Sequence, residues 1–177
     1  MDEASETIKK NKEIADKFTR IEEELPLFSE PRELFEKLLV RLHEEFAVPF
    51  VWLSIVNRPD SAGLVQTLSS SGILADRLNI IDEASFLELS SRGETPVLAN
   101  QDLNPFYRLL PRSKKFFIKS IAVAPITLDG QIIGSINYGD AANKRYEQGM
   151  DTSLLQHLTG AVSSCLTRLL KADPSGA

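Results

Sequence analysis

The sequence of 177 residues contains a single cysteine, Cys165, so no disulfide can form within the chain. One cysteine also excludes a structural zinc site built from several thiolates, and it is typical of a reducing compartment. No stretch approaches the roughly 18 consecutive apolar residues that span a bilayer. The N-terminal residues alternate acidic and basic side chains instead of forming the apolar core of a signal peptide. We therefore expect a cytoplasmic protein without a membrane segment.

An excess of positive charge is also lacking. Twenty Lys and Arg stand against 25 Asp and Glu, and the formal net charge is −5. This is the wrong sign for a protein that coats nucleic acid or an anionic membrane. Apolar residues make up 42% and charged residues 25% of the chain, which is typical of a globular fold and excludes general disorder. The length suits a single domain.

Motifs that carry chemistry are scarce. The sequence has no phosphate-binding glycine loop, no nucleophile elbow and no convincing pair of catalytic acids. His43 and His157 lie in predicted helices without other ligands at a metal-binding spacing. We expect no catalytic residue, no metal and no cofactor, and hence a protein that is not an enzyme.

The first 28 residues predict a charged amphipathic helix. Ile14, Phe18, Ile21 and Leu25 recur at helical spacing and form one narrow apolar stripe. A helix over residues 4–25 would be about 33 Å long, which is too long and too polar to be enclosed by one small core. We expect residues 1–28 to be a dimerisation helix with these four residues in a homodimer interface. The alternative is a helix that lies across its own domain.

Residues 29–172 predict an α+β domain, followed by a flexible tail over residues 173–177. Hydrophobic spacing, N-caps and turn residues indicate its helices and strands. The expected elements are a helix from the Ser29 N-cap to Phe46, a strand over 50–56, a weaker strand near 64–68, a short helix from Asp82 to Leu89, a strand over 96–100, a hairpin around Asp129-Gly130 and a closing helix that begins at Asp151 or Thr152.

The two faces of the predicted hairpin differ in character, so we expect different parts of the protein to pack against them. A two-residue turn would pair Ala124 with Ser135 and Ala122 with Asn137, on a face of small and polar side chains. The opposite face is aliphatic and should pack against the helices. Small side chains cannot fill a core to normal density. The small face therefore either lines a ligand cavity or meets the long connections between residues 57 and 119.

Three strings of the sequence resemble the GAF domain family. They are PVLANQDLNPFYR over 96–108, SIAVAPITLDGQIIGSINYGD over 120–140 and RYEQGMDTSLLQHLTGAVSSCL over 145–166. The last string is also similar to a bacterial GAF-like family of unknown function. The resemblance implies a central six-stranded antiparallel sheet, terminal helices on one face and a pocket covered by loops and short helices on the other. It also implies dimerisation through the first and last helices.

The ligand-binding residues expected on this basis lie on the small face and in the covering loops. They are Trp52, Ser54, Phe86, Asn100, Asp102, Phe106, Tyr107, Arg108, Ser120, Ala122, Ser135 and Asn137. Between Arg108 and Lys119 there are five basic residues and no acidic one. This charge favours an anionic ligand such as a nucleotide or a carboxylate, although a solvated basic surface would carry the same pattern.

Two functions follow as hypotheses. The first is a homodimeric sensor module of bacterial signalling, which binds a small molecule and whose state is read by a partner protein. The second is an adaptor that binds no ligand and serves for dimerisation or protein interaction.

Overall fold

The computed structural model describes residues 3–90, 93–110 and 117–172. The predicted tail over 173–177, and Arg112, Lys114 and Lys115 of the basic segment, lie outside the described residues. The helices and strands are α1 (Glu3–Glu24), α2 (Pro31–Phe46), β1 (Phe50–Asn57), α3 (Ala62–Ser69), β2 (Leu78–Asp82), α4 (Glu83–Leu89), β3 (Val97–Ala99), β4 (Ser120–Leu128), β5 (Gln131–Asp140) and α5 (Ser153–Ala172). Short 3₁₀ helices are η1 (Leu25–Leu27), η2 (Pro59–Ser61) and η3 (Asn104–Arg108).

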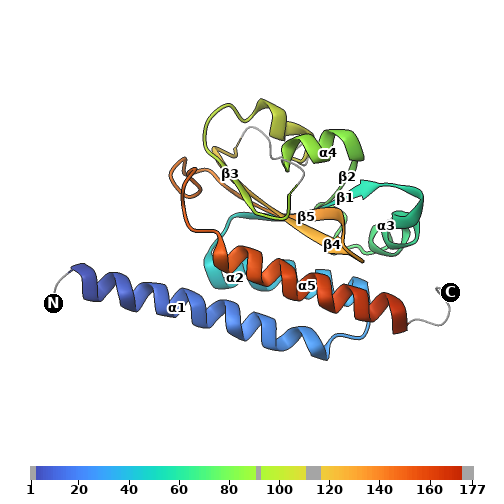
Figure 1. The fold of residues 1–177 in the computed structure, drawn as a ribbon, viewed down its shortest axis with the longest axis horizontal. Helices are drawn as coiled ribbons and strands as arrows, with labels where there is room; N and C mark the ends of the chain where they lie inside the picture. Colours follow the sequence, from blue (N-terminus) through green and yellow to red (C-terminus); the bar gives the residue numbers. More distant parts are fainter. Residues whose placement is uncertain (1–2, 91–92, 111–116, 173–177) are drawn as a thin grey trace.

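The molecule is built in layers around one sheet (Figure 1). Helices α1, α2 and α5 lie below the sheet, and α4 lies above it together with the segment that follows β3. Apolar side chains of the sheet therefore face two cores. The lower core joins the sheet to α1, α2, α3 and α5, and the upper core joins it to α4 and the covering segment.

The sheet has five described strands in the order β2-β1-β5-β4-β3, and β1 pairs with β2 in parallel. The predicted antiparallel sheet of six strands is therefore wrong in strand number and in one pairing, while the α+β plan is confirmed. The parallel pair arises because residues 62–69 form helix α3 rather than the expected strand. Leu64 and Leu68 are four residues apart and both buried, which is the period of one helix face. The helix serves as the crossover that a parallel pair requires.

The hairpin has an irregular register between Ile126 and Thr127. Thr127 pairs with Ile132 and Ile126 with Gly134, so Ile133 is the extra residue of a β-bulge. The predicted pairing is therefore wrong by one residue, because a bulge moves every later side chain to the opposite face.

The bulge separates the residues that were expected to share the small face. Ala124 pairs with Ile136 and Ala122 with Tyr138, and all four are buried in the lower core against the helices. Ser135 and Asn137 instead face the upper layer, beside Trp52 and Ser54 of β1. The antiparallel pairing of β1 with β5 brings these four side chains together.

The C-terminal half of α1 packs inside the chain. Phe18, Ile21 and Leu25 are buried in the lower core, and the rings of Phe18 and Phe46 lie 4.5 Å apart. The expectation that these three residues form a dimer interface is corrected, because their partners are helices of the same chain. Of the four, only Ile14 is exposed, at 40%.

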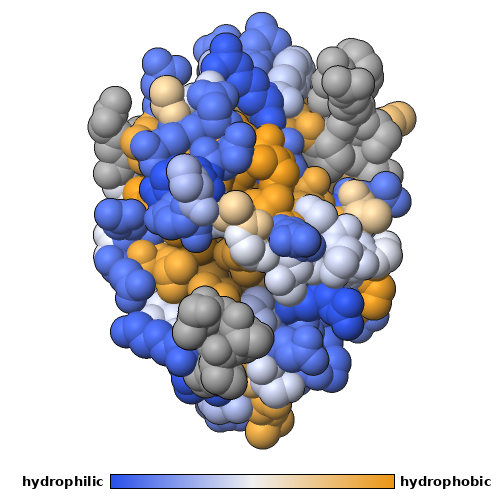
Figure 2. Space-filling view, turned by 90° about the vertical axis from the view of Figure 1, so that its right-hand side faces the viewer, coloured by the Kyte–Doolittle hydropathy of each residue, from blue (hydrophilic) through white to orange (hydrophobic). Residues whose placement is uncertain are grey.

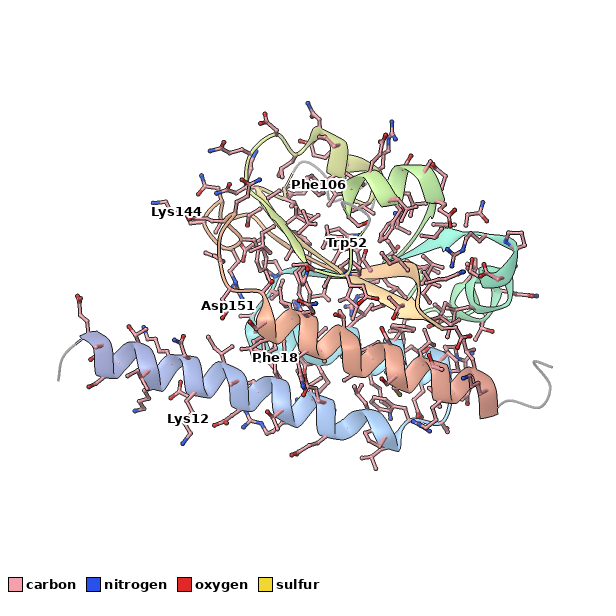
Figure 3. The ribbon with its side chains drawn as sticks, in the orientation of Figure 1. Lys12, Phe18, Trp52, Phe106, Lys144 and Asp151 are labelled. Atoms are coloured by element: carbon pink, nitrogen blue, oxygen red, sulfur yellow. The ribbon has the colours of Figure 1, made fainter. Side chains whose placement is uncertain are left out.

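The N-terminal half of α1 projects beyond the rest of the domain (Figure 1). Every residue from 3 to 14 is exposed. Lys12 points away from the body of the molecule, whereas Phe18 points toward it (Figure 3). Within the described part of the chain, no helix combines the length and apolar character that crossing a bilayer requires.

Candidate functional site

The upper core lies on the face of the sheet opposite the helices. Its buried members are Trp52, Val56, Ile81, Phe86, Leu89, Ala99, Leu109, Leu110, Ile118, Ile121 and Val123. Residues 100–110, which we call the lid, run over this face and contain η3. Trp52 lies between the sheet and the segment that carries Phe106 (Figure 3). The predicted covering of this face by a short helix and a loop segment is therefore present.

Helix α4 is fixed at its N-terminus by a side-chain cap. The Asp82 carboxylate accepts a hydrogen bond of 3.0 Å from the backbone N–H of Ser85. Hydrogen bonds from Ser85, with a smaller contribution from Arg108, hold the pKa of Asp82 below its ordinary value. The cap positions Phe86 under the lid, where it is fully buried.

Three hydrogen bonds hold the end of the lid. The indole Nε1 of Trp52 donates to the carbonyl oxygen of Leu109 at 2.6 Å, and Asn79 Nδ2 donates to the carbonyl oxygen of Arg108 at 3.1 Å. Arg108 Nη1 donates in turn to the Ser85 hydroxyl at 2.8 Å. The lid is thus tied to β1, β2 and α4 through side chains rather than through a strand ladder.

Four polar side chains gather on the sheet beneath the lid and form what we call the polar cluster: Ser54, Asn79, Ser135 and Asn137. Asn137 Nδ2 donates to Ser54 Oγ at 2.9 Å, and Ser135 Oγ donates to Asn137 Oδ1 at 2.6 Å. Asn79 Nδ2 lies 3.3 Å from Ser54 Oγ. Ser54, Ser135 and Asn137 are fully buried. The cluster is therefore a connected network from three adjacent strands.

The structure brings part of the predicted site together. Trp52, Ser54, Phe86, Arg108, Ser135 and Asn137 lie on the lid side of the sheet. Ala122 does not, because it is buried in the lower core. Ser120 is also separate, since its hydroxyl donates to the carbonyl oxygen of Ala142 at 2.7 Å. Tyr107 is 37% exposed on the outside of the lid.

Asn100, Asp102 and Phe106 line a different depression, a groove of about 530 Å³ beside the edge strand β3. Asn100 is tied to the loop after β5, because its Nδ2 donates to the carbonyl oxygen of Asn143 at 2.9 Å. Phe106 also packs against the upper core, so it borders both regions.

Asn79 was missed by the sequence reading. It belongs to the cluster because the parallel pair places it opposite Ser54. In the pattern LNIID, strand alternation puts Asn79 on the same face as the apolar Ile81. This alternation alone does not show that Asn79 lies beside Ser54, because that follows only from the parallel pairing of β1 with β2.

A shallow hollow of about 670 Å³ lies near the tip of the β4–β5 hairpin. It belongs to the face in Figure 2, where hydrophobic side chains are exposed among hydrophilic ones. Arg58 at its border is neutralised by Asp60 at 3.0 Å and Glu83 at 2.7 Å. Among the described residues that line the hollow, the one cationic side chain is therefore paired.

The side chains of the polar cluster are neutral. The polar cluster consists of amides and hydroxyls without an ionisable partner in its hydrogen bonds. Cys165 is buried under α1, where its Sγ lies 3.3 Å from the carbonyl oxygen of Leu25. Among the described residues, no group of three or more His, Cys, Asp and Glu could hold a metal ion.

Comparison with known proteins identifies one family. The GAF domain model matches residues 30–166, which is most of the chain. The match covers the elements from α2 to α5, including the sheet, the lid and the polar cluster. No curated protein matches the chain.

Proposed function

The chain belongs to the GAF domain family, and from this premise we propose that it is a regulatory module, without catalytic activity, that binds a small molecule between the lid and the sheet. Domains of this family generally serve ligand-binding signalling or regulation. In the closed arrangement the lid covers the polar cluster. A ligand would favour an arrangement in which the lid lies differently, and a partner protein in the cytoplasm would respond to the difference.

The observation that carries this proposal is the polar cluster. Burying Ser54, Ser135 and Asn137 in an otherwise apolar layer costs free energy, which their hydrogen bonds only offset. Apolar side chains would fill the same space at no such cost. Polar groups retained beneath a covering segment suit the few directional contacts by which a ligand site orients its ligand.

The fastening of the lid supports the same proposal. Its hydrogen bonds with the sheet come from Trp52 and Asn79, both to lid carbonyl oxygens. Two such bonds contribute about 1 kcal/mol each. A ligand that forms equivalent hydrogen bonds with the polar cluster would offset their loss.

A ligand-free adaptor is the second candidate, and one observation favours it. The side chains of the polar cluster already have partners within the chain, and Trp52 is only 2% exposed under the lid. A site that is closed in this way needs no ligand to satisfy its polar groups.

A thermal-shift screen of nucleotides and metabolites separates the two candidates, with the first compounds chosen by mass spectrometry of what copurifies with the protein. A ligand of the native state raises the melting temperature by mass action. We expect a concentration-dependent rise for the wild type that is lost in Asn137→Ala. Asn100→Ala is the matched control, because it removes an asparagine outside the polar cluster. A flat screen would favour the adaptor, and equal shifts in both variants would place the ligand elsewhere.

We further propose that the module acts as a homodimer. The support is a set of exposed apolar side chains near the start of the seam between α1 and α5, which we call the seam patch: Ile14, Met150 and Leu154 are 40%, 43% and 37% exposed. The two helices run in the same direction (Figure 1) and are joined by the Glu22–His157 hydrogen bond of 2.8 Å. Glu22 contacts His157, four residues after the start of α5. Ile14 is eight residues before Glu22 on α1, so it lies beside the residues that precede α5.

A further inference from the structure

A second cavity lies at the beginning of β1, outside the space that the lid covers. It has a volume of about 270 Å³. The side chains that matter for its chemistry are His43, Phe50, Trp52, Asp76 and Arg77, from the last turn of α2, the first residues of β1 and the turn before β2. Neither the lid nor the polar cluster is among its described lining residues. We call it the Arg77 cavity.

The fold places Arg77 beside Trp52. The backbone N–H of Leu53 donates to the carbonyl oxygen of Arg77 at 2.7 Å, and Leu53 pairs with Leu78 in the parallel ladder. Leu53 faces the lower core, so the preceding pair, Trp52 and Arg77, faces the other side. Arg77 and Trp52 both line the cavity.

Arg77 has no anionic partner among the described residues. Its Nη1 is buried and makes no hydrogen bond. A buried donor of a charged group that stays unsatisfied costs free energy, and such groups are normally paired. Arg58 also has a buried nitrogen, Nη2, without a hydrogen bond, but its guanidinium is paired with Asp60 and Glu83, whereas that of Arg77 forms no ion pair with a described carboxylate. Arg77 therefore offers the cavity a guanidinium that no described carboxylate neutralises.

His43 adds a second polar group to the cavity. Its Nδ1 lies 2.6 Å from the carbonyl oxygen of Val48. A carbonyl oxygen can only accept, so Nδ1 carries the hydrogen and Nε2 remains for another partner. The remaining wall is aromatic, from Phe50 and Trp52, and suits an apolar group.

Asp76 limits the charge that the cavity accepts. It is exposed at the rim, next to Arg77, and would repel a ligand with several negative charges. One guanidinium fork matches one carboxylate. We propose that the Arg77 cavity binds a small monocarboxylate with an apolar body, with the carboxylate on Arg77 and the apolar body against Phe50, next to the buried indole of Trp52. This site is additional to the one proposed under the lid.

Fluorescence of Trp52 tests this proposal directly, because Trp52 is the only tryptophan of the chain and lies in the cavity wall. The full-length protein is titrated with sodium benzoate and, separately, with benzamide, which has the same shape but no charge. We expect a saturable change of emission with benzoate and at least tenfold weaker binding of benzamide. Absence of a saturable change, or equal binding of both compounds, would overturn the proposal.

Variants assign the carboxylate to Arg77. We expect Arg77→Gln to weaken benzoate binding at least tenfold, while Arg20→Gln, which removes the same charge from an exposed position of α1, leaves it unchanged. Circular dichroism checks folding. Should Arg77→Gln not fold, Arg77→Lys keeps the charge without the planar fork and is expected to weaken binding severalfold. Unchanged affinity in whichever of these variants folds would overturn the proposal.

Asn137→Ala separates this site from the one under the lid. It should leave benzoate binding intact, whether or not the lid site binds a ligand of its own. Loss of benzoate binding in Asn137→Ala together with its retention in Arg77→Gln would place benzoate under the lid and overturn the proposal.

Discussion

Gly134 lies where the backbone of β5 approaches that of β1 too closely for a side chain. A Cβ added there would lie 2.0 Å from the carbonyl oxygen of Ser54 and 3.0 Å from its carbonyl carbon. Both atoms are backbone, so the contact could be relieved only by separating two central strands. The glycine is therefore required next to the β-bulge, and it holds Ser54 in place for the polar cluster.

We expect Gly134→Ala to lower the free energy of unfolding by about 3 kcal/mol, because overpacking against backbone forces the strands apart. The matched control is Gly160→Ala in the exposed middle of α5, where an added Cβ would meet no atom within 4 Å. This control should raise the free energy of unfolding by about 0.5 to 1 kcal/mol through helix propensity. Urea denaturation of both variants measures the effects. A tolerated Gly134→Ala would contradict the observed strand spacing.

The residues of the site were only partly predictable. Strand alternation could place Ser135 with Asn137 and Trp52 with Ser54, and the two pairs share one face only because β1 pairs with β5. Ala122 was assigned to the same face because the bulge at Ile133 leaves no clear mark in a sequence that is apolar on both sides of the turn.

At the scale of elements, α1 is held against α5 by its C-terminal half. His157 Nδ1 lies 2.8 Å from Glu22 Oε1, and this hydrogen bond raises the pKa of His157 above its ordinary value of 6.5. Nearer the C-terminal end of α5, Arg168 Nη2 donates to the carbonyl oxygen of Phe28, just after η1, at 3.4 Å. Polar contacts therefore flank the buried apolar stripe along the seam.

The pKa of His157 predicts how the seam responds to pH. A raised pKa in the folded state means that protonated His157 is stabilised by folding. Its contribution is complete below the unfolded value near 6.5 and is lost as the pH rises through the folded value. NMR titration should give a pKa above the ordinary value in the wild type and a return toward it in Glu22→Gln. Glu23→Gln, which removes a neighbouring exposed charge, should have a much smaller effect. An unshifted His157 in the wild type would contradict the contact.

Most elements could be predicted because their signals are local. The Asp82 cap predicts the start of α4, and Asp129-Gly130 predicts the turn of the hairpin. Apolar residues at helical spacing predict α2 and α5. The parallel pairing of β1 with β2 could not be predicted, because it depends on where α3 returns the chain. Asn79 was missed for the same reason, since only this pairing brings it to Ser54.

At the scale of the whole molecule, α1 has two halves with different environments. Phe18, Ile21 and Leu25 belong to the lower core, whereas residues 3–14 are exposed and extend past the domain (Figure 1). Charged substitutions at Phe18 or Ile21 would therefore unfold the chain and say nothing about self-association. A test of the proposed homodimer has to use the exposed patch at the seam.

Sedimentation velocity of Ile14→Glu provides that test. We expect the wild type to sediment as a dimer and Ile14→Glu as a folded monomer, because a charge in the seam patch of Ile14, Met150 and Leu154 would be buried without a partner in the interface. Ile8→Glu is the matched control. It makes the same change six residues earlier, about 120° around the helix from Ile14 at 3.6 residues per turn, and Ile8 is 69% exposed. The control should remain dimeric. A monomeric wild type would contradict the proposed homodimer. Dissociation by Ile8→Glu but not by Ile14→Glu would show that the interface is formed by the projecting half of α1 and not by the seam patch.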